Sequence, residues 1–210
     1  MRIIYVTIIL FVLSAGKLPA QGTLRFRHVG IEDGLSQGSV YHMLKDSKGY
    51  LWMSSQDGVN KFNGKNFEVY LSGTSGESTN VQGIAEDKDG QIWIGSHKGI
   101  FKYDRSRDKF SQVAFSKVIL TGSIHVFADR AKSIYLLTEE GLFSLHKDKV
   151  KRLTNQLSYN RSQFNNFITT TPDGDIWLLN PGQGISRYSV QSNKITKYFC
   201  SPTDILNPEF

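Results

Sequence analysis

One pattern of acidic, glycine and aromatic residues recurs four times along this chain of 210 residues, and a fixed period constrains a fold more than any single motif does. The aromatic residues of successive copies lie 41 or 42 residues apart. The repeated positions are Asp46, Gly49, Trp52 and Gly58; Asp87, Gly90, Trp93 and Gly99; Asp129, Tyr135 and Gly141; and Gly174, Trp177 and Gly184. The third copy has Lys132 in place of the first glycine, and the fourth has Thr171 in place of the aspartate.

Each copy has the pattern of four short strands. In the first copy, residues 40–45 alternate between apolar and polar types, as a half-buried strand does. Further strands are expected at 50–54, 59–62 and 67–71, separated by turn sequences such as Asn63-Gly64. Antiparallel units of this kind, repeated at this period, are typical of β-propeller blades. The sequence therefore predicts an all-β propeller with four four-stranded antiparallel blades.

The large aromatic residue of each copy is predicted to belong to the core rather than to a surface that binds sugars. It falls on the second strand, where a large ring can fill the space between adjacent sheets. This expectation applies to Trp52, Trp93, Tyr135 and Trp177.

Residues 1–20 are typical of a secretory signal peptide. Arg2 precedes an apolar run over residues 3–13 that only Thr7 interrupts, and small or turn-forming residues follow as far as Ala20. This run is shorter than the roughly 20 residues that a membrane-spanning helix needs. We therefore expect export with cleavage after Ala20; the alternative is an uncleaved N-terminal segment that is amphipathic or buried.

The charge pattern does not favour binding to nucleic acid. The formal net charge is +6, and the densest basic cluster, at residues 147–152, alternates with other residues as a solvated strand face does. No nucleic-acid recognition motif accompanies it, so no nucleic-acid partner is expected. A single cysteine, Cys200, excludes an internal disulfide framework, so packing must stabilise the fold.

The first two copies resemble the repeats of the two component regulator propeller family. The similar stretches in and before the first copy are residues 26–40, 46–52 (DSKGYLW) and 57–64 (DGVNKFNG). Residues 89–96 (DGQIWIGS) of the second copy are similar to the same repeat. Taken with the two weaker copies, the resemblance covers about residues 24–200.

The resemblance implies an architecture larger than this chain. In that family, such repeats build one or two seven-bladed propellers in the periplasm, followed by an immunoglobulin-like domain, a transmembrane helix and a cytoplasmic histidine kinase. The four blades are therefore expected to be part of a seven-bladed ring, periplasmic and, in the intact family member, anchored in the inner membrane. The expected boundaries are blades at about 40–80, 81–122, 123–163 and 164–200, a strand at 24–29 for the last blade of a complete ring, and the start of a truncated next blade at 201–210.

The resemblance also implies a role in signalling. The expected function is that of the ligand-sensing segment of a hybrid two component histidine kinase, with an oligosaccharide or another small molecule as the ligand, which would control the use of polysaccharides. The expected protein partner is a membrane-anchored kinase or a missing C-terminal region, and a homodimer is left open. The alternatives are a stand-alone scaffold for protein interactions, the remnant of a split gene, and a propeller-fold polysaccharide lyase or glycosidase.

The sequence predicts no catalytic centre, no cofactor and no metal site. The five histidines have no metal-ligand spacing and are expected on the surface or in loops. Residues 87–90 resemble the start of a calcium loop, but the glutamate that should follow is missing and the same turn recurs at 46–49. No phosphate-binding loop and no paired carboxylates for glycoside hydrolysis are present in the sequence. The chain is therefore not expected to be an enzyme.

Ligand-binding residues are expected on the loops that precede the first strand of each blade, since ligands of propellers usually lie over the central axis. The candidate residues are Ser36, Gln37, Ser39, Asn80, Asn165 and Asn166. The alternative interpretation is that these polar residues only form turns.

Overall fold

The computed structural model describes residues 26–73, 79–115, 120, 122–158, 167–180 and 184–198. These residues form four four-stranded antiparallel sheets and one short 3-10 helix, η1 (Ile31–Asp33). The first sheet contains β1 (His42–Lys45), β2 (Leu51–Ser55), β3 (Gly58–Phe62) and β4 (Phe67–Tyr70). The second contains β5 (Val81–Glu86), β6 (Ile92–Ser96), β7 (Gly99–Asp104) and β8 (Lys109–Val113). The third contains β9 (His125–Ala128), β10 (Ile134–Thr138), β11 (Gly141–His146) and β12 (Lys149–Thr154). The fourth contains β13 (Phe167–Thr170), β14 (Ile176–Asn180), β15 (Gly184–Ser189) and β16 (Lys194–Tyr198).

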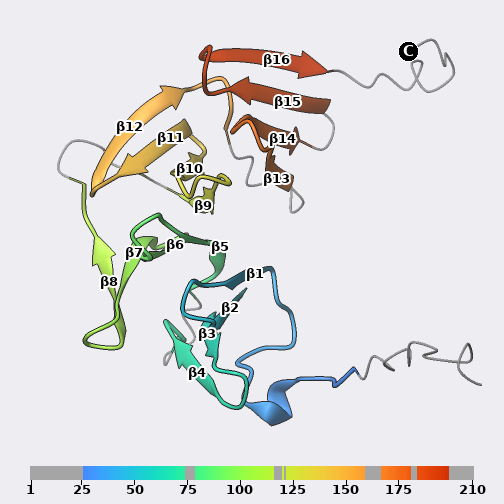
Figure 1. Cartoon of the computed structure of the whole chain (residues 1–210), viewed down its shortest axis with the longest axis vertical. Coiled ribbons are helices and arrows are strands. Elements are labelled where there is room, and N and C mark those ends of the chain that lie inside the picture. Colours follow the sequence, from blue (N-terminus) through green and yellow to red (C-terminus); the bar gives the residue numbers. More distant parts are fainter. Residues whose placement is uncertain are drawn as a thin grey trace, which may run out of the picture.

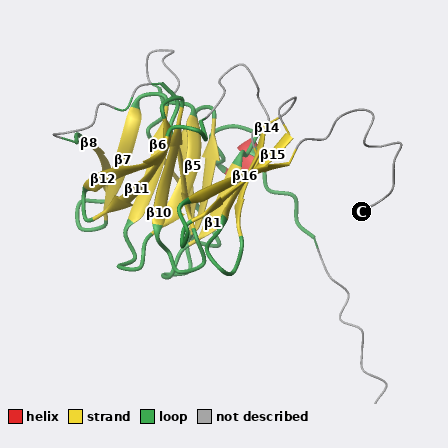
Figure 2. Ribbon diagram, turned by 90° about the horizontal axis from the view of Figure 1, so that it is seen from above, coloured by secondary structure: helices red, strands yellow, loops and turns green. Residues whose placement is uncertain are grey.

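The four sheets are arranged as blades around a common centre. Each sheet pairs its strands in sequence order, and Figure 1 shows the sheets along an open arc with β1, β5, β9 and β13 on its inner side. Seen at right angles to this view, most strands run between two rims of turns and loops (Figure 2). This arrangement confirms the predicted all-β propeller. Among the described residues, no helix is long and apolar enough to cross a membrane.

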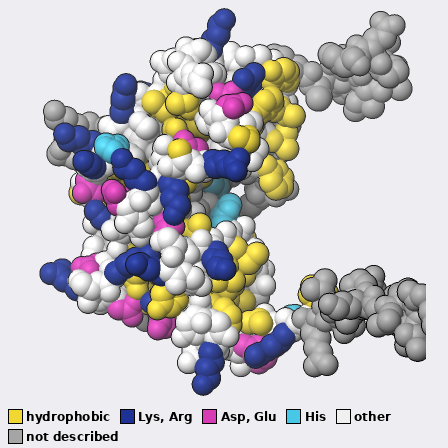
Figure 3. Space-filling view, in the orientation of Figure 1, with side chains coloured by type: hydrophobic (Ala, Val, Ile, Leu, Met, Phe, Trp, Pro, Cys, Tyr) yellow, Lys and Arg dark blue, Asp and Glu magenta, His cyan; other side chains and the backbone are white. Residues whose placement is uncertain are grey.

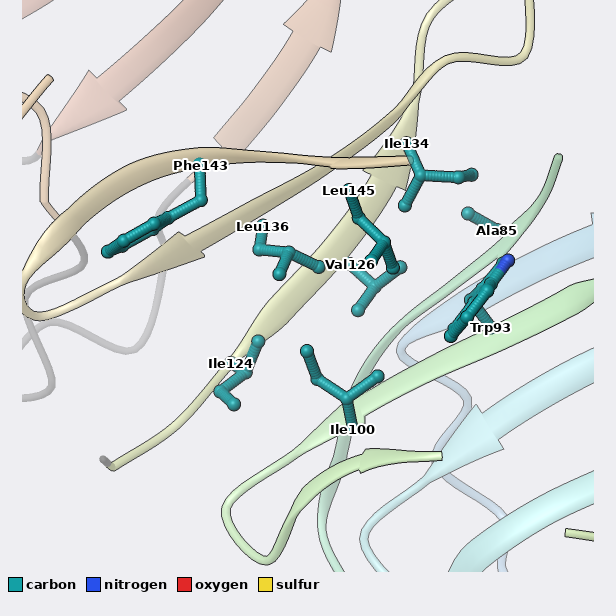
Figure 4. Packing of buried hydrophobic residues seen from close by; sticks show 9 residues of the cluster. All are labelled: Ala85, Trp93, Ile100, Ile124, Val126, Ile134, Leu136, Phe143 and Leu145. Atoms are coloured by element: carbon teal, nitrogen blue, oxygen red, sulfur yellow. The ribbon is translucent and has the colours of Figure 1, made fainter. Parts of the chain in front are cut away.

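The core consists of apolar layers between neighbouring blades. One cluster joins the first and second blades, another the second and third, and another the third and fourth. In the middle cluster, Trp93 and Ile100 of the second blade pack with Ile134 and Leu145 of the third (Figure 4). Each blade is therefore stabilised mainly by its neighbours, because a single sheet cannot bury both of its faces alone.

The repeated aspartate ties the aromatic residue of its blade to the preceding turn. One carboxylate oxygen of Asp46 accepts hydrogen bonds from the backbone N–H groups of Lys48 and Tyr50, both at 2.9 Å. The other oxygen accepts the indole N–H of Trp52 at 3.0 Å. Trp52 is 0% exposed, so this bond satisfies a donor that would otherwise be buried without a partner. The indole N–H of Trp93 likewise donates to the carboxylate of the corresponding aspartate, Asp87, at 2.8 Å.

The fourth blade departs from this pattern at Trp177. Trp52, Trp93 and Tyr135 are buried, as expected of core residues, whereas Trp177 is only half-buried and stacks on Tyr198 with ring centroids 5.6 Å apart. Among the described residues, the buried indole nitrogen of Trp177 has no hydrogen-bond partner. The sequence explains this, because Thr171 replaces the aspartate that accepts this bond in the first two blades.

The second and third blades approach closely because glycines face β9. A β-carbon at Gly95 would lie 2.2 Å from the carbonyl oxygen of Ile124, and one at Gly83 would lie 2.3 Å from the carbonyl oxygen of Val126. Backbone cannot move aside as a flexible side chain can. We expect Gly95→Ala to lower the free energy of unfolding by about 1–3 kcal/mol, measured by denaturant titration. Gly38→Ala is the control, because nothing lies within 4 Å of its β-carbon; equal losses in the two variants would contradict this account.

The outward face of the fourth blade carries exposed apolar side chains. Phe167, Leu179 and Tyr198 are 65%, 37% and 43% exposed, and strand pairing places them in one row across the sheet, with Ile185 between Leu179 and Tyr198. Figure 3 shows hydrophobic side chains gathered along this free side of the upper blade. In the inner blades, the corresponding faces are covered by the next sheet.

Some sequence expectations differ from the structure at the N-terminal side. Residues 26–29, part of the strand expected at 24–29, are not in a sheet, and residues 24 and 25 lie outside the described residues. The first strand begins at His42 rather than at residue 40. The expected signal peptide (1–20) and the expected start of a further blade (201–210) lie outside the described residues.

The basic cluster has the predicted exposed environment. Lys147 and Asp148 form the turn between β11 and β12, both with positive φ, as a type I′ hairpin turn requires. Lys149, Lys151 and Arg152 are exposed on β12.

Candidate ligand-binding site

Ser36, Gln37 and Asn80 lie together around the turn between β2 and β3. The backbone N–H of Ser36 donates to the side-chain oxygen of Asn60 at 2.8 Å, and the Asn60 amide donates to the Ser36 hydroxyl at 2.9 Å. The backbone of Gln56 links the other two residues, since its N–H donates to Gln37 and its carbonyl accepts from the N–H of Asn80. We call these five residues the loop cluster. Its internal hydrogen bonds also agree with the alternative in which such residues form turns.

Ser39 is not part of the loop cluster. Ser39 is exposed in the segment between the cluster and β1. Asn165 and Asn166 lie outside the described residues.

Two histidines lie beside the loop cluster, where the innermost strands begin. His42 and His125 are the first residues of β1 and β9, and their ring centroids are 6.2 Å apart in an edge-to-face arrangement. His125 is only 8% exposed, and burial lowers its pKa to about 4. The expectation of surface or loop positions is therefore wrong for His125. The cause is that β9 packs closely against β5, and the sequence pattern did not show this.

A cavity of about 490 Å³ lies at the opposite ends of the innermost strands. It is bordered by the last residues of β1, β5 and β9 and by the turns that follow them. We call it the central cavity. Its apolar wall includes Leu44, Ile84 and Phe127. Its charged lining includes both basic and acidic residues: Lys45, Arg130 and Lys132, and Asp46, Glu86 and Asp129.

Glu86 joins three blades beside the central cavity. Its carboxylate accepts hydrogen bonds from the backbone N–H and the hydroxyl of Ser47 in the first blade, and Lys132 of the third blade lies 2.6 Å away. Arg105 is 3.8 Å away. Burial by itself raises the pKa of Glu86, but the bonds from Lys132 and Ser47 outweigh it and hold the pKa below its usual value.

The stability of the protein is expected to decrease in acid because of two buried carboxylates. Burial raises the pKa of Asp46, but the hydrogen bonds from Trp52 and Arg105 outweigh it, so Asp46 and Glu86 both have folded-state pKa values below those of the unfolded chain. A depressed carboxyl pKa stabilises the fold above the unfolded value and ceases to do so as the pH falls through the folded value. We therefore expect the free energy of unfolding to decline as the pH falls below about 4.5, the ordinary pKa of a glutamate.

The Glu86→Gln variant tests this cause. It should be less stable by about 1–2 kcal/mol at pH 7 and should show a shallower decline in acid, measured by denaturant titration at several pH values. Asp173→Asn is the control of equal charge change, since Asp173 is exposed in the turn after β13. If the stability of Glu86→Gln changed with pH as that of the wild type does, Glu86 would not be a cause of the decline in acid.

Another cavity, of about 420 Å³, opens between the second and third blades at the same end of the molecule as the central cavity. Its walls come from the turns after β5, β9 and β11 and from the strands that carry Trp93 and Tyr135. We call it the junction cavity. Sequence reasoning missed both cavities, because it searched only the loops at the other end of the strands.

Comparison with protein families supports the repeat pattern. The model of the family described as two component regulator propeller matches residues 34–57 and 75–98. These segments include the loop before β1, the first two strands of the first blade, and their counterparts in the second blade. The first half of each of the first two blades thus matches a two component regulator propeller repeat. The expected resemblance is thereby confirmed for these repeats.

A curated protein with a similar segment is much longer than this chain. Histidine kinase P4 of Formosa agariphila is 38% identical over 76 residues, which are 36% of this chain and 6% of that protein. The chain thus spans a small fraction of the length of that kinase.

Solved structures share the propeller fold at low sequence identity. The extracellular domain of a hybrid two component system from Bacteroides thetaiotaomicron aligns with a TM-score of 0.63 and 22% identity, over 82% of this chain and 26% of that one. Virginiamycin B lyase from Staphylococcus aureus aligns with a TM-score of 0.58 and 14% identity, over 78% of this chain and 56% of that one. The fold is therefore compatible both with extracellular domains of signalling proteins and with an enzyme.

Proposed function

We propose that these regulator propeller blades are the ligand-sensing part of a hybrid two component signalling protein, and that the ligand is an oligosaccharide outside the cytoplasm. The observation that carries the proposal is the match of the first two blades to the two component regulator propeller family. The fold shared with extracellular domains of hybrid two component systems supports it. In this proposal the chain is periplasmic and acts on a membrane-anchored kinase region. The exposed face of the fourth blade is then covered by further blades of a larger ring.

The arrangement of polar groups suits recognition rather than bond cleavage. The loop cluster offers amide and hydroxyl groups, which hydrogen-bond to sugar hydroxyls, and the two cavities lie at the other end of the strands. A sensor needs selective binding and a change in stability or shape, and blades that are stabilised mainly by their neighbours can transmit such a change.

A thermal-shift screen of the full chain against plant and host oligosaccharides tests the proposal. A ligand that binds only the folded state raises the melting temperature with the logarithm of its concentration. A saturable shift with one class of sugar, without chemical change in that sugar, is the expected result. No shift with any sugar would overturn the oligosaccharide proposal, and accumulation of cleaved sugar would indicate a propeller lyase or glycosidase instead.

A further inference from the structure

Each junction between neighbouring blades joins two different sheet faces. One blade contributes the face that carries its repeated aromatic residue, such as Trp52 or Trp93, and the next blade contributes its opposite face. The third and fourth blades are joined in the same way through Tyr135. Among the described residues, the first and the fourth blade therefore each have one face without a neighbouring sheet. These two faces are of opposite kinds and lie at opposite ends of the arc (Figure 1).

The free face of the fourth blade, which we call the leading face, is apolar where the next blade covers the other sheets. It carries Phe167, Leu179, Ile185 and Tyr198, with Trp177 beside them. Leu137 and Leu142 occupy two of these positions in the third blade, where they are 2% and 0% exposed because the fourth blade covers them. An exposed apolar face of this kind marks an interaction surface.

The free face of the first blade, which we call the trailing face, is apolar at the positions that pack on a preceding blade elsewhere. It carries Met43, Leu51, Met53, Phe62, Phe67 and Val69. Met43 is 68% exposed, whereas Ile84 and Val126, at the same position of the second and third blades, are 9% and 2% exposed. The trailing face is thus the counterpart that a leading face packs against.

The segment before β1 lies over part of the trailing face. The backbone N–H of Ser36 donates to the side chain of Asn60, which faces the same side of the sheet as Met53, at 2.8 Å. The preceding residue, Leu35, is 6% exposed. A leucine followed by serine also precedes the fourth blade, and this residue, Leu157, belongs to the apolar cluster between the third and fourth blades. The trailing face therefore already has a leucine that an occupied junction has.

Charged residues at the two faces are complementary. Between the first and second blades, Glu86 accepts a hydrogen bond from the backbone N–H of Ser47. The first blade has an exposed lysine, Lys45, at the position of Glu86. The fourth blade has Pro172 at the position of Ser47, followed by the exposed Asp173. Pro172 has no N–H to offer a carboxylate, whereas Asp173 offers a carboxylate to a lysine.

We propose that a second copy of this chain covers both faces. The leading face of each copy packs on the trailing face of the other, with Lys45 of one copy beside Asp173 of its partner. The inference rests on one part of the proposed function, the larger ring, and names what supplies the further blades. The ring then has eight blades, which lies within the range of propellers, rather than the seven that the family resemblance implies. Two copies joined in this way form a closed, symmetric dimer without a free sheet face.

The mass of the native protein in solution tests the proposal. Light scattering after size-exclusion chromatography, on protein purified from cells that express the full chain, should give the mass of two chains at concentrations down to about 10 µM. A monomer at about 100 µM would overturn the inference. Masses that keep growing with concentration would overturn it as well, because faces that join without closing a ring give a filament.

A charge placed in either face should separate the dimer. Leu179→Lys in the leading face and Met43→Lys in the trailing face should each raise the dissociation constant at least tenfold. Both positions are exposed in the single chain, so neither substitution should unfold it, and thermal melting checks this. Val190→Lys is the control, since Val190 is 38% exposed in the turn between β15 and β16. If only one of the two variants separates the dimer, like faces pair with each other and the inference is wrong.

An exchange of charges tests the contact between Lys45 and Asp173. Lys45→Asp and Asp173→Lys each bring like charges together and should weaken the dimer severalfold, and this effect should shrink as the salt concentration rises. The combined variant restores opposite charges and should dimerise as the wild type does. If the combined variant were weaker than either single variant, the two residues would not meet and the proposed arrangement would be wrong.

The outcomes separate this inference from the proposed function. A monomer whose melting temperature rises with a sugar overturns the inference, while the sensor proposal stands and another polypeptide segment covers the leading face. A dimer that no sugar stabilises overturns the oligosaccharide proposal, while the ring of two copies stands.

Discussion

Replacing Trp52 with alanine is expected to lower the free energy of unfolding by about 3–5 kcal/mol. The side chain is 0% exposed and contacts both the first and the second blade. Its removal leaves a cavity at the blade junction and deprives Asp46 of the indole N–H that it accepts at 3.0 Å. Denaturant titration followed by circular dichroism measures the change.

Trp177→Ala is the matched control for this prediction. Trp177 is at the equivalent position of the fourth blade, but it is half-buried and its indole nitrogen has no partner among the described residues. We expect its loss to cost about 1–2 kcal/mol, in proportion to the smaller apolar area that it buries. If the two variants lost equal stability, neither the contacts of Trp52 with the neighbouring blade nor its bond to Asp46 would add to its stabilising effect.

Replacing Lys61 with methionine is expected to cost about 1.5–3 kcal/mol, because the enclosed ammonium group loses its hydrogen bonds to charged partners. The cost stays below that of a fully buried pair, since Glu68 and Asp108 are 47% and 56% exposed. The ammonium group lies 2.8 Å from Glu68 and 3.2 Å from Asp108 and is 4.7 Å from the centre of the Tyr50 ring. Burial lowers the pKa of Lys61, but its bonds to Glu68 and Tyr103 outweigh this, so the lysine is charged in the fold.

The equivalent substitution between the second and third blades, Lys102→Met, provides the control. Lys102 is 38% exposed and its partner Asp148 is 55% exposed, so the pair is worth about 0–1 kcal/mol. Melting temperatures and denaturant midpoints of the two variants measure the difference. A loss in Lys102→Met as large as that in Lys61→Met would show that enclosure by aromatic rings does not matter.

The blades could be predicted from the sequence because the residues that define each blade lie close together in the sequence. The turn that contains Asp46 and Gly49, the alternation in the following strand and the spacing to Gly58 all lie within one copy, and a hairpin pairs residues that are near in sequence. The recurrence of the same pattern then indicated radial repetition. The error at the first strand was small, since pairing with β2 starts at His42.

The candidate site could be predicted only in part. Ser36, Gln37 and Asn80 were chosen because they precede first strands, and the structure brings them together around Gln56. The sequence pattern did not show that His42 and His125, 83 residues apart, would lie beside each other. Nor did it show that Leu145 and Val150 take the positions between the second and third blades that Tyr103 and Phe110 take between the first and second, because this equivalence depends on strand pairing.

The sequence by itself determined the repeat, the all-β class, the four-stranded blades and the burial of Trp52, Trp93 and Tyr135, because backbone geometry and side-chain alternation act over a few residues. The tertiary structure decided which side chains fill each blade junction, where Glu86 finds partners in two other blades, and which apolar face of the fourth blade is exposed. These features depend on the volumes and charges of side chains that meet across blades, and residues far apart in the sequence meet only when the blades pack against one another.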